Sequence, residues 1–336
     1  MKKGIVVAGY ADLDLIKTIR TFPAPHGLTE ITGISRALGG AACNCSLDMA
    51  LLEPETTVYP LAVIGRDAEG EYMMERLAAP KNIDLSLVLR EGQTGFTDVL
   101  DAADTRVRTF ICFRGANRLL SEDRIDPARL NCDLFHIGYI LLLDALDAAD
   151  PEYGTRMARL LKKIREAGIA TSVDVITDDS GLHKVLVPPA LRYTDYLTIN
   201  EHEAAATCGI PLRDGADRLL LGNMEPALRA LRAMGVGRWV CVHAPEGAFG
   251  VDEAGDYVPV PGADLPEGFI KGTVGAGDAF VSGLLLAARR HAPLREAMED
   301  GIAAAVCSLT DAGASDGLRP IGEARALLRT LPRRVF

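Results

Sequence analysis

The sequence lacks the features that mark secreted and membrane-spanning chains. No apolar stretch in its 336 residues approaches the ~20 residues that span a bilayer. The apolar run at residues 4–9 is soon followed by Asp12 and Asp14, so it is too short for a secretory signal and predicts a first buried strand. The seven cysteines show no paired CxxC spacing, which favours reduced thiols over a disulfide framework. We therefore expect a cytoplasmic protein with no membrane partner.

Positive charge is in deficit. The chain has 36 Lys and Arg residues against 46 Asp and Glu residues, which gives a formal net charge of -10. Because a protein that binds duplex nucleic acid needs a basic face, no nucleic-acid partner is expected. The charge does not exclude a phosphate ligand, because a phosphate needs only a local cluster of donors and a metal.

Two common nucleotide-binding motifs are also absent. A dinucleotide-dependent oxidoreductase would carry GxGxxG directly after the first strand, and residues 9–12 do not supply it. Gly65 and Gly70 have the spacing of a P-loop, but Glu71 and Tyr72 follow where Lys and Ser or Thr are required. The sequence therefore argues against both of these enzyme classes.

Short apolar, β-branched runs alternate with longer helical patterns along most of the chain. Strands that alternate with helices indicate βαβ crossovers and a mostly parallel sheet covered on both faces. No repeat, low-complexity tract or linker marks a boundary. We therefore predict an α/β fold with three α/β/α layers, in which residues 1–336 form a single domain. The predicted strands are Ile5–Ala8, Leu134–Ile137, Thr171–Val175, Tyr196–Ile199 and Trp239–Val242, and the predicted helices are Ala41–Leu52, Tyr153–Ala167, Glu201–Cys208 and Glu225–Met234.

Two segments break the alternation, at about residues 11–36 and 88–113. Thr94–Leu100 and Arg106–Phe113 are β-prone runs on either side of the polar residues 101–104, which predicts a hairpin. Extra antiparallel strands that project from a parallel sheet can form a lid over an active site. The alternative is an edge decoration without a catalytic role.

The most informative stretch lies at residues 271–286. Its second half is apolar nearly all round, which predicts a buried helix, and Gly275, Ala276 and Gly277 lie where that helix begins. Without bulky side chains, their backbone N–H groups and the helix dipole suit the oxygens of a phosphoryl group in transfer. Asp278 is within reach of the same hollow and can accept a proton from an attacking hydroxyl. The alternative is a tight turn with Asp278 as a capping side chain.

Residues 272–278 resemble DTxGAGD, the carboxy-terminal signature of the ribokinase-like (PfkB) carbohydrate kinases, with Gly272 in place of the leading Asp. The resemblance implies that Gly275–Gly277 form an anion hole, that Asp278 is the catalytic base and that Thr273 lies beside the cofactor. It also implies that Gly272 has lost a secondary polar contact.

The amino-terminal half carries matches to the sugar-binding motifs of the same family. Gly39, Gly40 and Asn44 resemble GGxxxN, in which two glycines let backbone amides approach a polyhydroxylated ligand and the Asn offers a donor and an acceptor. Asp14 matches the carboxylate that holds sugar hydroxyls in the GxxNxD segment, with Asp12 where Asn is common. The alternative for Asp14 is a solvated acid in a turn.

Two further matches lie on the nucleotide side. Asn200 and Glu203 resemble the NxxE motif, whose oxygen ligands suit Mg²⁺ held largely through water. Ala244 and Gly247 match a nucleotide-side GxxG turn, with Ala244 replacing the first Gly. The segment 301–305 resembles the helix of the adenine pocket, with Ile302 where Asn is frequent.

The matches cover nearly the whole chain in the expected order. The resemblance implies an ATP-dependent kinase that phosphorylates a hydroxyl of a sugar or sugar derivative, with ATP and Mg²⁺ as cofactors and a monovalent cation such as K⁺ as a further option. It also allows a homodimer formed through the lid. A nucleoside kinase and a non-catalytic sugar or nucleoside sensor are the alternatives, because the sequence does not identify the acceptor.

Overall fold

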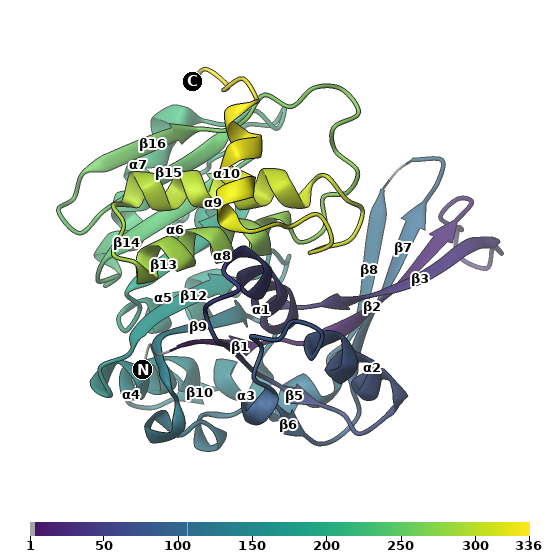
Figure 1. The fold of residues 1–336 in the computed structure, drawn as a ribbon, viewed down its shortest axis with the longest axis horizontal. Helices are drawn as coiled ribbons and strands as arrows, with labels where there is room; N and C mark the ends of the chain where they lie inside the picture. The colour runs from purple at the N-terminus through teal and green to yellow at the C-terminus, as the bar shows by residue number, and fades with distance from the viewer. Residues whose placement is uncertain (1–3, 106) are drawn as a thin grey trace.

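The computed structural model describes residues 4–105 and 107–336. Its main body is a sheet whose eight strands lie in the order β16-β15-β14-β13-β12-β9-β1-β4 (Figure 1). The strands are β1 (Gly4–Gly9), β4 (Val58–Leu61), β9 (Cys132–Ile140), β12 (Ala170–Val175), β13 (Tyr196–Asn200), β14 (Trp239–Ala244), β15 (Gly247–Val251) and β16 (Tyr257–Pro261). All five predicted strands are confirmed, with ends one to three residues longer where they differ.

Six strands, from β4 to β14, run parallel, and β15 and β16 are added antiparallel at one edge. Strand β1 illustrates how the sheet is buried on both faces. Val6 and Ala8 belong to one apolar core, while Ile5 and Val7 belong to the core on the opposite face. Because side chains alternate along a strand, a continuous apolar run fills both cores at once. The prediction of a mostly parallel, doubly covered sheet is therefore confirmed.

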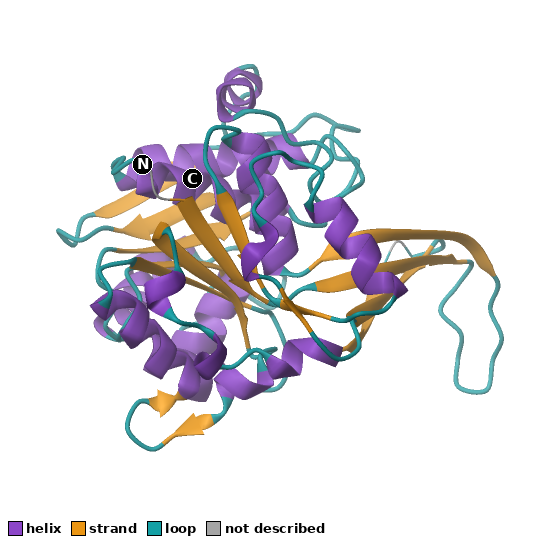
Figure 2. Ribbon diagram, turned by 60° about the horizontal axis from the view of Figure 1, so that its bottom comes forward, coloured by secondary structure: helices purple, strands orange, loops and turns teal. Residues whose placement is uncertain are grey.

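Helices cover the two faces and complete the three layers (Figure 2). One face packs against α1 (Ala41–Leu52), α8 (Ala276–Arg289), α9 (Leu294–Ser308) and α10 (Ile321–Arg329). The other packs against α4 (Arg156–Glu166), α5 (His183–Leu191), α6 (Glu201–Cys208) and α7 (Leu221–Ala233).

The predicted bounds of α1 and α6 agree with the structure, but those of α4 and α7 differ. The start predicted for α4, at Tyr153, is wrong because the Thr155 side chain accepts a hydrogen bond from the Ala158 amide and begins the helix after itself. Helix α7 begins at Leu221, four residues before the predicted start at Glu225, and it contains Pro226.

A separate four-stranded sheet, called here the small sheet, extends away from the main body (Figure 2). It consists of β3 (Ile31–Gly39), β2 (Asp12–Ile19), β7 (Gly95–Ala102) and β8 (Arg108–Phe113), in that order. The pair β7–β8 is antiparallel, as the predicted hairpin requires. The pair β2–β3 is also antiparallel, whereas β2 and β7 pair in parallel, and the sequence predicted neither of these two pairings. Helix α2 (Ala68–Leu77) packs beneath this sheet.

The predicted hairpin exists, but its turn lies further along the chain than expected. Asp101 pairs in register with Arg108, so residues 101–102 continue strand β7 instead of forming the turn. Arg106, the first residue of the predicted second run, lies outside the described residues. The start of the predicted lid segment also differs, because β6 (Leu89–Arg90) pairs with β5 (Val63–Ile64) and not with the small sheet.

The seven cysteines are free thiols. In the described part of the chain, none of the helices combines the length and the apolar character that crossing a bilayer requires.

Candidate active site

Helix α8 begins in a tight turn that leaves its first amides open. Gly275 precedes the helix with a φ of 76°, in the left-handed region, and a Cβ there would lie 2.7 Å from the Cβ of Ala314. A residue with a side chain is therefore disfavoured at this position both by strain and by contact. No side chain caps this end of the helix among the described residues, so the amides of Gly277 and Asp278 face outward with the positive end of the helix dipole.

The Asp278 carboxylate is buried and held by two hydrogen bonds from distant parts of the chain. Oδ2 accepts from the Asn44 amide nitrogen at 2.9 Å, and Oδ1 accepts from the Tyr139 hydroxyl at 2.7 Å. The Cys45 thiol lies 3.7 Å from Oδ1. Burial raises the pKa of Asp278, and the two hydrogen bonds oppose that rise because they favour the charged form. Asn44, which the sequence assigned to substrate binding, thus also orients the predicted base.

The predicted sugar-binding residues meet where the small sheet joins the main body. Gly39, at the end of β3, lies so close to two carboxylates that a Cβ there would be 2.5 Å from Asp12 Oδ1 and 3.0 Å from Asp14 Oδ1. Gly40 has a φ of 81°, and a Cβ there would be 2.4 Å from the Tyr10 carbonyl oxygen. Gly39 thus lets the end of β3 lie close to the two carboxylates of β2, and Gly40 lets the start of α1 lie close to the Tyr10 backbone. The approach of their amides to a ligand stays a prediction.

Two residues near Asp278 were missed by the sequence analysis. Tyr139 donates to Asp278, and Asp174 is a buried carboxylate whose pKa is raised well above its usual range by burial and by the charges of Glu203 and Asp278. Both lie at the carboxyl ends of parallel strands, β9 and β12. Ligands of open α/β sheets bind at those ends, so strand position was the signal that could have found them.

Asn200 and Glu203 form a capping box at the start of α6. The Asn200 side chain accepts from the Glu203 amide, and the Glu203 carboxylate accepts from the Asn200 amide at 2.9 Å. Glu203 also accepts from the Thr177 hydroxyl at 2.7 Å. Burial is the main cause that raises the pKa of Glu203 to about 7. Because its oxygens already have partners within the chain, Glu203 fits contact with a metal through water better than direct ligation.

The other predicted cofactor-binding residues line one cavity of about 720 Å³ beside the α8 turn. Thr273, Asn200, Ala244 and Gly247 all border it, and Gly277 borders its end nearest Asp278. The ring of His243 lies over that of Phe280, with the ring centroids 4.9 Å apart. The remaining wall is mostly apolar and includes Leu265, Ile270, Ile302, Ala305, Val306 and Leu309. The cavity thus offers apolar walls at one end and open backbone amides at the other.

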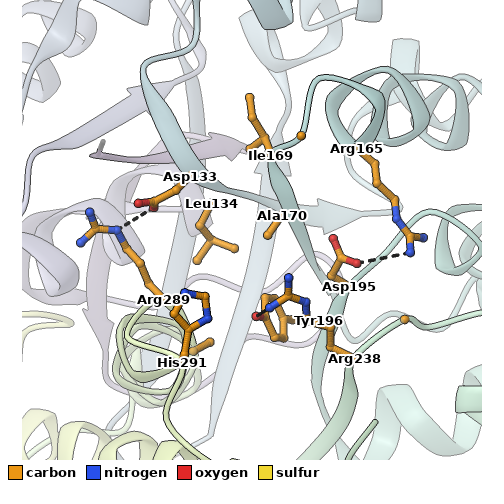
Figure 3. A pocket seen from close by; sticks show the side chains of 13 residues that line it. Asp133, Leu134, Arg165, Ile169, Ala170, Asp195, Tyr196, Arg238, Arg289 and His291 are labelled. Atoms are coloured by element: carbon orange, nitrogen blue, oxygen red, sulfur yellow. Dashed lines mark hydrogen bonds and ion pairs between the residues drawn. The ribbon is translucent and has the colours of Figure 1, made fainter. Parts of the chain in front are cut away.

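A second cavity, of about 550 Å³, lies at the amino ends of β9, β12 and β13, away from this site (Figure 3). Its walls carry several arginines, and each of them has a partner within the chain. Arg165 pairs with Asp195 at 3.5 Å, Arg289 pairs with Asp133 at 2.7 Å, and Arg238 donates to the Tyr196 hydroxyl at 2.8 Å (Figure 3). We therefore locate the candidate active site at the carboxyl ends of the strands.

Comparisons with known proteins agree with this architecture. The model of the pfkB family carbohydrate kinases matches residues 2–320. No curated protein matches the chain. Among solved structures, ribokinase from Arabidopsis thaliana, determined with ribose and ATP, is similar with a TM-score of 0.78 and 21% identity over 98% of this chain and 99% of that one.

Two more solved structures share the fold. Ribokinase from Thermotoga maritima has a TM-score of 0.74 and 21% identity over 97% of this chain and 99% of that one. A nucleoside kinase from Methanocaldococcus jannaschii has a TM-score of 0.72 and 17% identity over 98% and 100% of the two chains. At these identities the likeness shows the fold alone, which is ribokinase-like. The match to the family model spans nearly the whole sequence, and the chain therefore belongs to the pfkB family of carbohydrate kinases.

Proposed function

We propose that this protein transfers the γ-phosphoryl group of ATP to a hydroxyl of a sugar or sugar derivative, most readily a primary alcohol. One observation carries the proposal. The buried Asp278 carboxylate lies in the first turn of a helix whose uncapped amides face outward, between the glycine-lined end of the small sheet and the cavity of about 720 Å³. A base and an anion hole side by side are the parts that phosphoryl transfer requires.

In the proposed reaction, Asp278 accepts the proton of the acceptor hydroxyl as that oxygen bonds to the γ-phosphorus. The bond from the γ-phosphorus to the β–γ bridging oxygen breaks, and ADP leaves. Asn44 and Tyr139 hold the carboxylate in one orientation throughout. The amides of the Gly275–Gly277 turn and the dipole of α8 stabilise the charge on the phosphoryl oxygens. A positioned general base contributes ~10²–10⁴ in rate.

The apolar cavity is the proposed site of the adenine and ribose of ATP. Its apolar wall suits a planar base, and Gly277 and Thr273 at the near end suit the phosphates. Ile302 lines this wall, so we expect the base to be held by packing more than by a side-chain hydrogen bond at that position. The ribokinase from Arabidopsis thaliana, determined with ribose and ATP, is a precedent for this pair of ligands on the same fold.

Asp174 and Glu203 are the residues proposed to attract Mg²⁺. Both are buried carboxylates, and the charge of Glu203 raises the pKa of Asp174, so a hydrated cation beside them would favour their charged forms. The described residues contain no group of three or more His, Cys, Asp or Glu side chains that could hold a metal ion by themselves, which fits an ion held mainly by phosphate and water. When bound with ATP, Mg²⁺ would neutralise charge on the phosphates.

The small sheet is the proposed lid. It carries Asp12 and Asp14 and extends beyond the main body, so its approach to the site would exclude water, a competing acceptor for the phosphoryl group. A cytoplasmic location is part of the proposal, because ATP is available there and seven free thiols suit a reducing compartment.

The test is release of ADP from ATP and Mg²⁺ with a panel of sugars, sugar acids, amino sugars and nucleosides. We expect turnover with at least one acceptor and a loss of ~10²-fold or more in kcat for Asp278→Asn, with ATP binding nearly unchanged. Turnover of Asp278→Asn near the unmodified rate would overturn the role of Asp278. Saturable binding of an acceptor without any ADP release would favour a sensor over a kinase.

A further inference from the structure

Two carboxylates of strand β2 converge on one point of the proposed acceptor site. Asp12 and Asp14 are two residues apart, so they project from the same face of the strand. Oxygens of both lie within 3.0 Å of the position that a Cβ on Gly39 would occupy. Only a residue without a side chain fits at position 39, so the two acids lie close together against the Gly39 backbone at the base of the small sheet.

No basic side chain of the described residues forms an ion pair with either acid. Asp12 Oδ2 accepts from the hydroxyl of Thr97 at 2.6 Å, which is an uncharged donor. The Asp14 side chain makes no hydrogen bond within the described part of the chain. The charge of Arg108 lowers the pKa of Asp14, but the Arg108 guanidinium forms its ion pair with Asp101, at 3.5 Å.

Apart from Arg108, the groups whose charges act on Asp14 are negative, and the neighbouring thiol and hydroxyl groups are neutral. Asp278 adds a third carboxylate from the main body, and its charge acts on Asp14. Burial and these same acids raise the pKa of the Cys43 thiol, and burial followed by Asp12 raises that of the Tyr10 hydroxyl. Neither group therefore supplies charge near neutral pH. The two acids therefore lie beside a third carboxylate and form no ion pair with a basic side chain of the described residues.

We propose that the natural acceptor carries a protonated amine, as an amino sugar or amino polyol does, and that Asp12 and Asp14 bind this ammonium group. The inference rests on the proposed kinase function and specifies its substrate class. A bound cation would offset the cost of burying two carboxylates, which a neutral hydroxyl does less well and an anionic sugar acid makes worse. Burial raises the pKa of Asp12 to about 6, and burial together with Asp12 and Asp278 raises that of Asp14 to about 8.

The test compares acceptors matched in size that differ in charge. D-glucosamine is paired with D-glucose, and 1-amino-1-deoxysorbitol with sorbitol, while gluconate, which keeps the C6 primary alcohol, is the anionic member. We expect kcat/KM for an amine to exceed that of its hydroxyl twin by about tenfold or more, and gluconate to be poorest. The ratio of amine to hydroxyl should fall as the pH drops from about 8 through about 6, because protonation of Asp14 and then of Asp12 removes their charges.

Asp12→Asn tests the assignment to this residue. Asn keeps the shape and can still accept from Thr97, so the ratio of amine to hydroxyl should fall about tenfold while the fold is kept. Asp98→Asn is the matched control, because Asp98 pairs with Lys17 and is in register with Leu15, on the opposite face of the same sheet. Asp98→Asn should leave the ratio unchanged.

Calorimetric binding of the same pairs separates this inference from the kinase proposal, since binding needs no turnover. Amine-selective binding without ADP release would support the inference and count against the kinase. Three outcomes would each overturn the inference. In the first, kcat/KM for the hydroxyl twins equals or exceeds that for the amines. In the second, Asp12→Asn leaves the ratio of amine to hydroxyl unchanged, and in the third no amine of the panel binds.

Discussion

Asp278 must be charged to accept a proton, yet it lies where charge is disfavoured. Burial raises its pKa, while hydrogen bonds from Asn44 and Tyr139 lower it, and burial is the larger effect. A carboxyl whose pKa is raised toward the working pH is a better proton acceptor than an exposed one. The number of donors on this carboxylate therefore sets both its basicity and the pH at which it becomes active.

Tyr139→Phe should shift the pH profile of the reaction. The hydroxyl of Tyr139 stabilises the charged carboxylate, so its removal should raise the pKa of Asp278 further. Because the base acts when deprotonated, the acidic limb of kcat/KM should move to higher pH, with a loss of about tenfold at neutral pH. The measurement is kcat/KM against pH. Tyr257→Phe in β16 is the control, and a profile for Tyr139→Phe equal to the control would count against the role of this hydroxyl.

Glu203→Gln should separate a capping role from a role toward the metal. Gln can keep the capping hydrogen bond to the Asn200 amide but carries no charge, so the fold should persist. Loss of the charge should raise the Mg²⁺ concentration needed for half-maximal turnover about tenfold. Titration of Mg²⁺ at fixed ATP, together with urea unfolding, measures both effects. Lower stability with an unchanged Mg²⁺ requirement would make Glu203 a capping residue only.

At the scale of elements, the site depends on how α8 begins. Its turn packs against residues 312–314, and a Cβ at Gly272 would lie 2.8 Å from the Ala312 carbonyl oxygen. The glycine that replaces the usual leading Asp at position 272 is therefore in close backbone contact with this loop. The turn and the loop are therefore packed directly against each other, and a change at either should disturb the anion hole.

Gly275→Ala should damage both the fold and the reaction. The left-handed φ and the contact with Ala314 predict a cost of ~1–3 kcal/mol in the free energy of unfolding, together with a loss of turnover as the amides tilt. Gly322→Ala in α10 is the matched control, because nothing lies within 4 Å of its Cβ position and Ala favours a helix. Urea denaturation and ADP release measure the two effects, and a Gly275→Ala protein as active as the control would show that the turn tolerates a side chain.

Elements with a strong local pattern could be predicted from the sequence, and their ends could be predicted only where a local signal fixes them. Helices α1 and α6 were predicted with their observed bounds, and α6 starts at the Asn200 cap. The predicted position of the hairpin turn was wrong. Asp101 is a typical turn residue and Ala102 has no strong preference, yet pairing with β8 extends strand β7 through these positions. Tertiary pairing overrode the local preference.

At the scale of the whole molecule, the site joins segments that no local pattern connects. Asn44 and Tyr139 are 234 and 139 residues from Asp278 in the chain, and both donate to its carboxylate. Family resemblance predicted Asn44 and Asp278 as separate motif residues, but the direct bond between them, and the roles of Tyr139 and Asp174, depend on packing. Such contacts follow from the order of the parallel strands, whose carboxyl ends bring these positions together.

The outer face of the small sheet supports a further prediction about assembly, a homodimer formed through this sheet. Ile34 and Ile111 are 76% and 56% exposed and lie in register with Lys17 and Asp98, on the face opposite to Asp12 and Asp14. Large exposed apolar side chains on an edge-containing sheet favour association with a second copy. Sedimentation velocity should show a dimer, and Ile34→Lys should weaken its association at least about tenfold, because a charge buried in the interface would have no partner.

Val185→Lys is the control, since Val185 is 62% exposed on α5, away from this sheet. A monomer at all concentrations would contradict the prediction, as would a dimer that Ile34→Lys leaves intact.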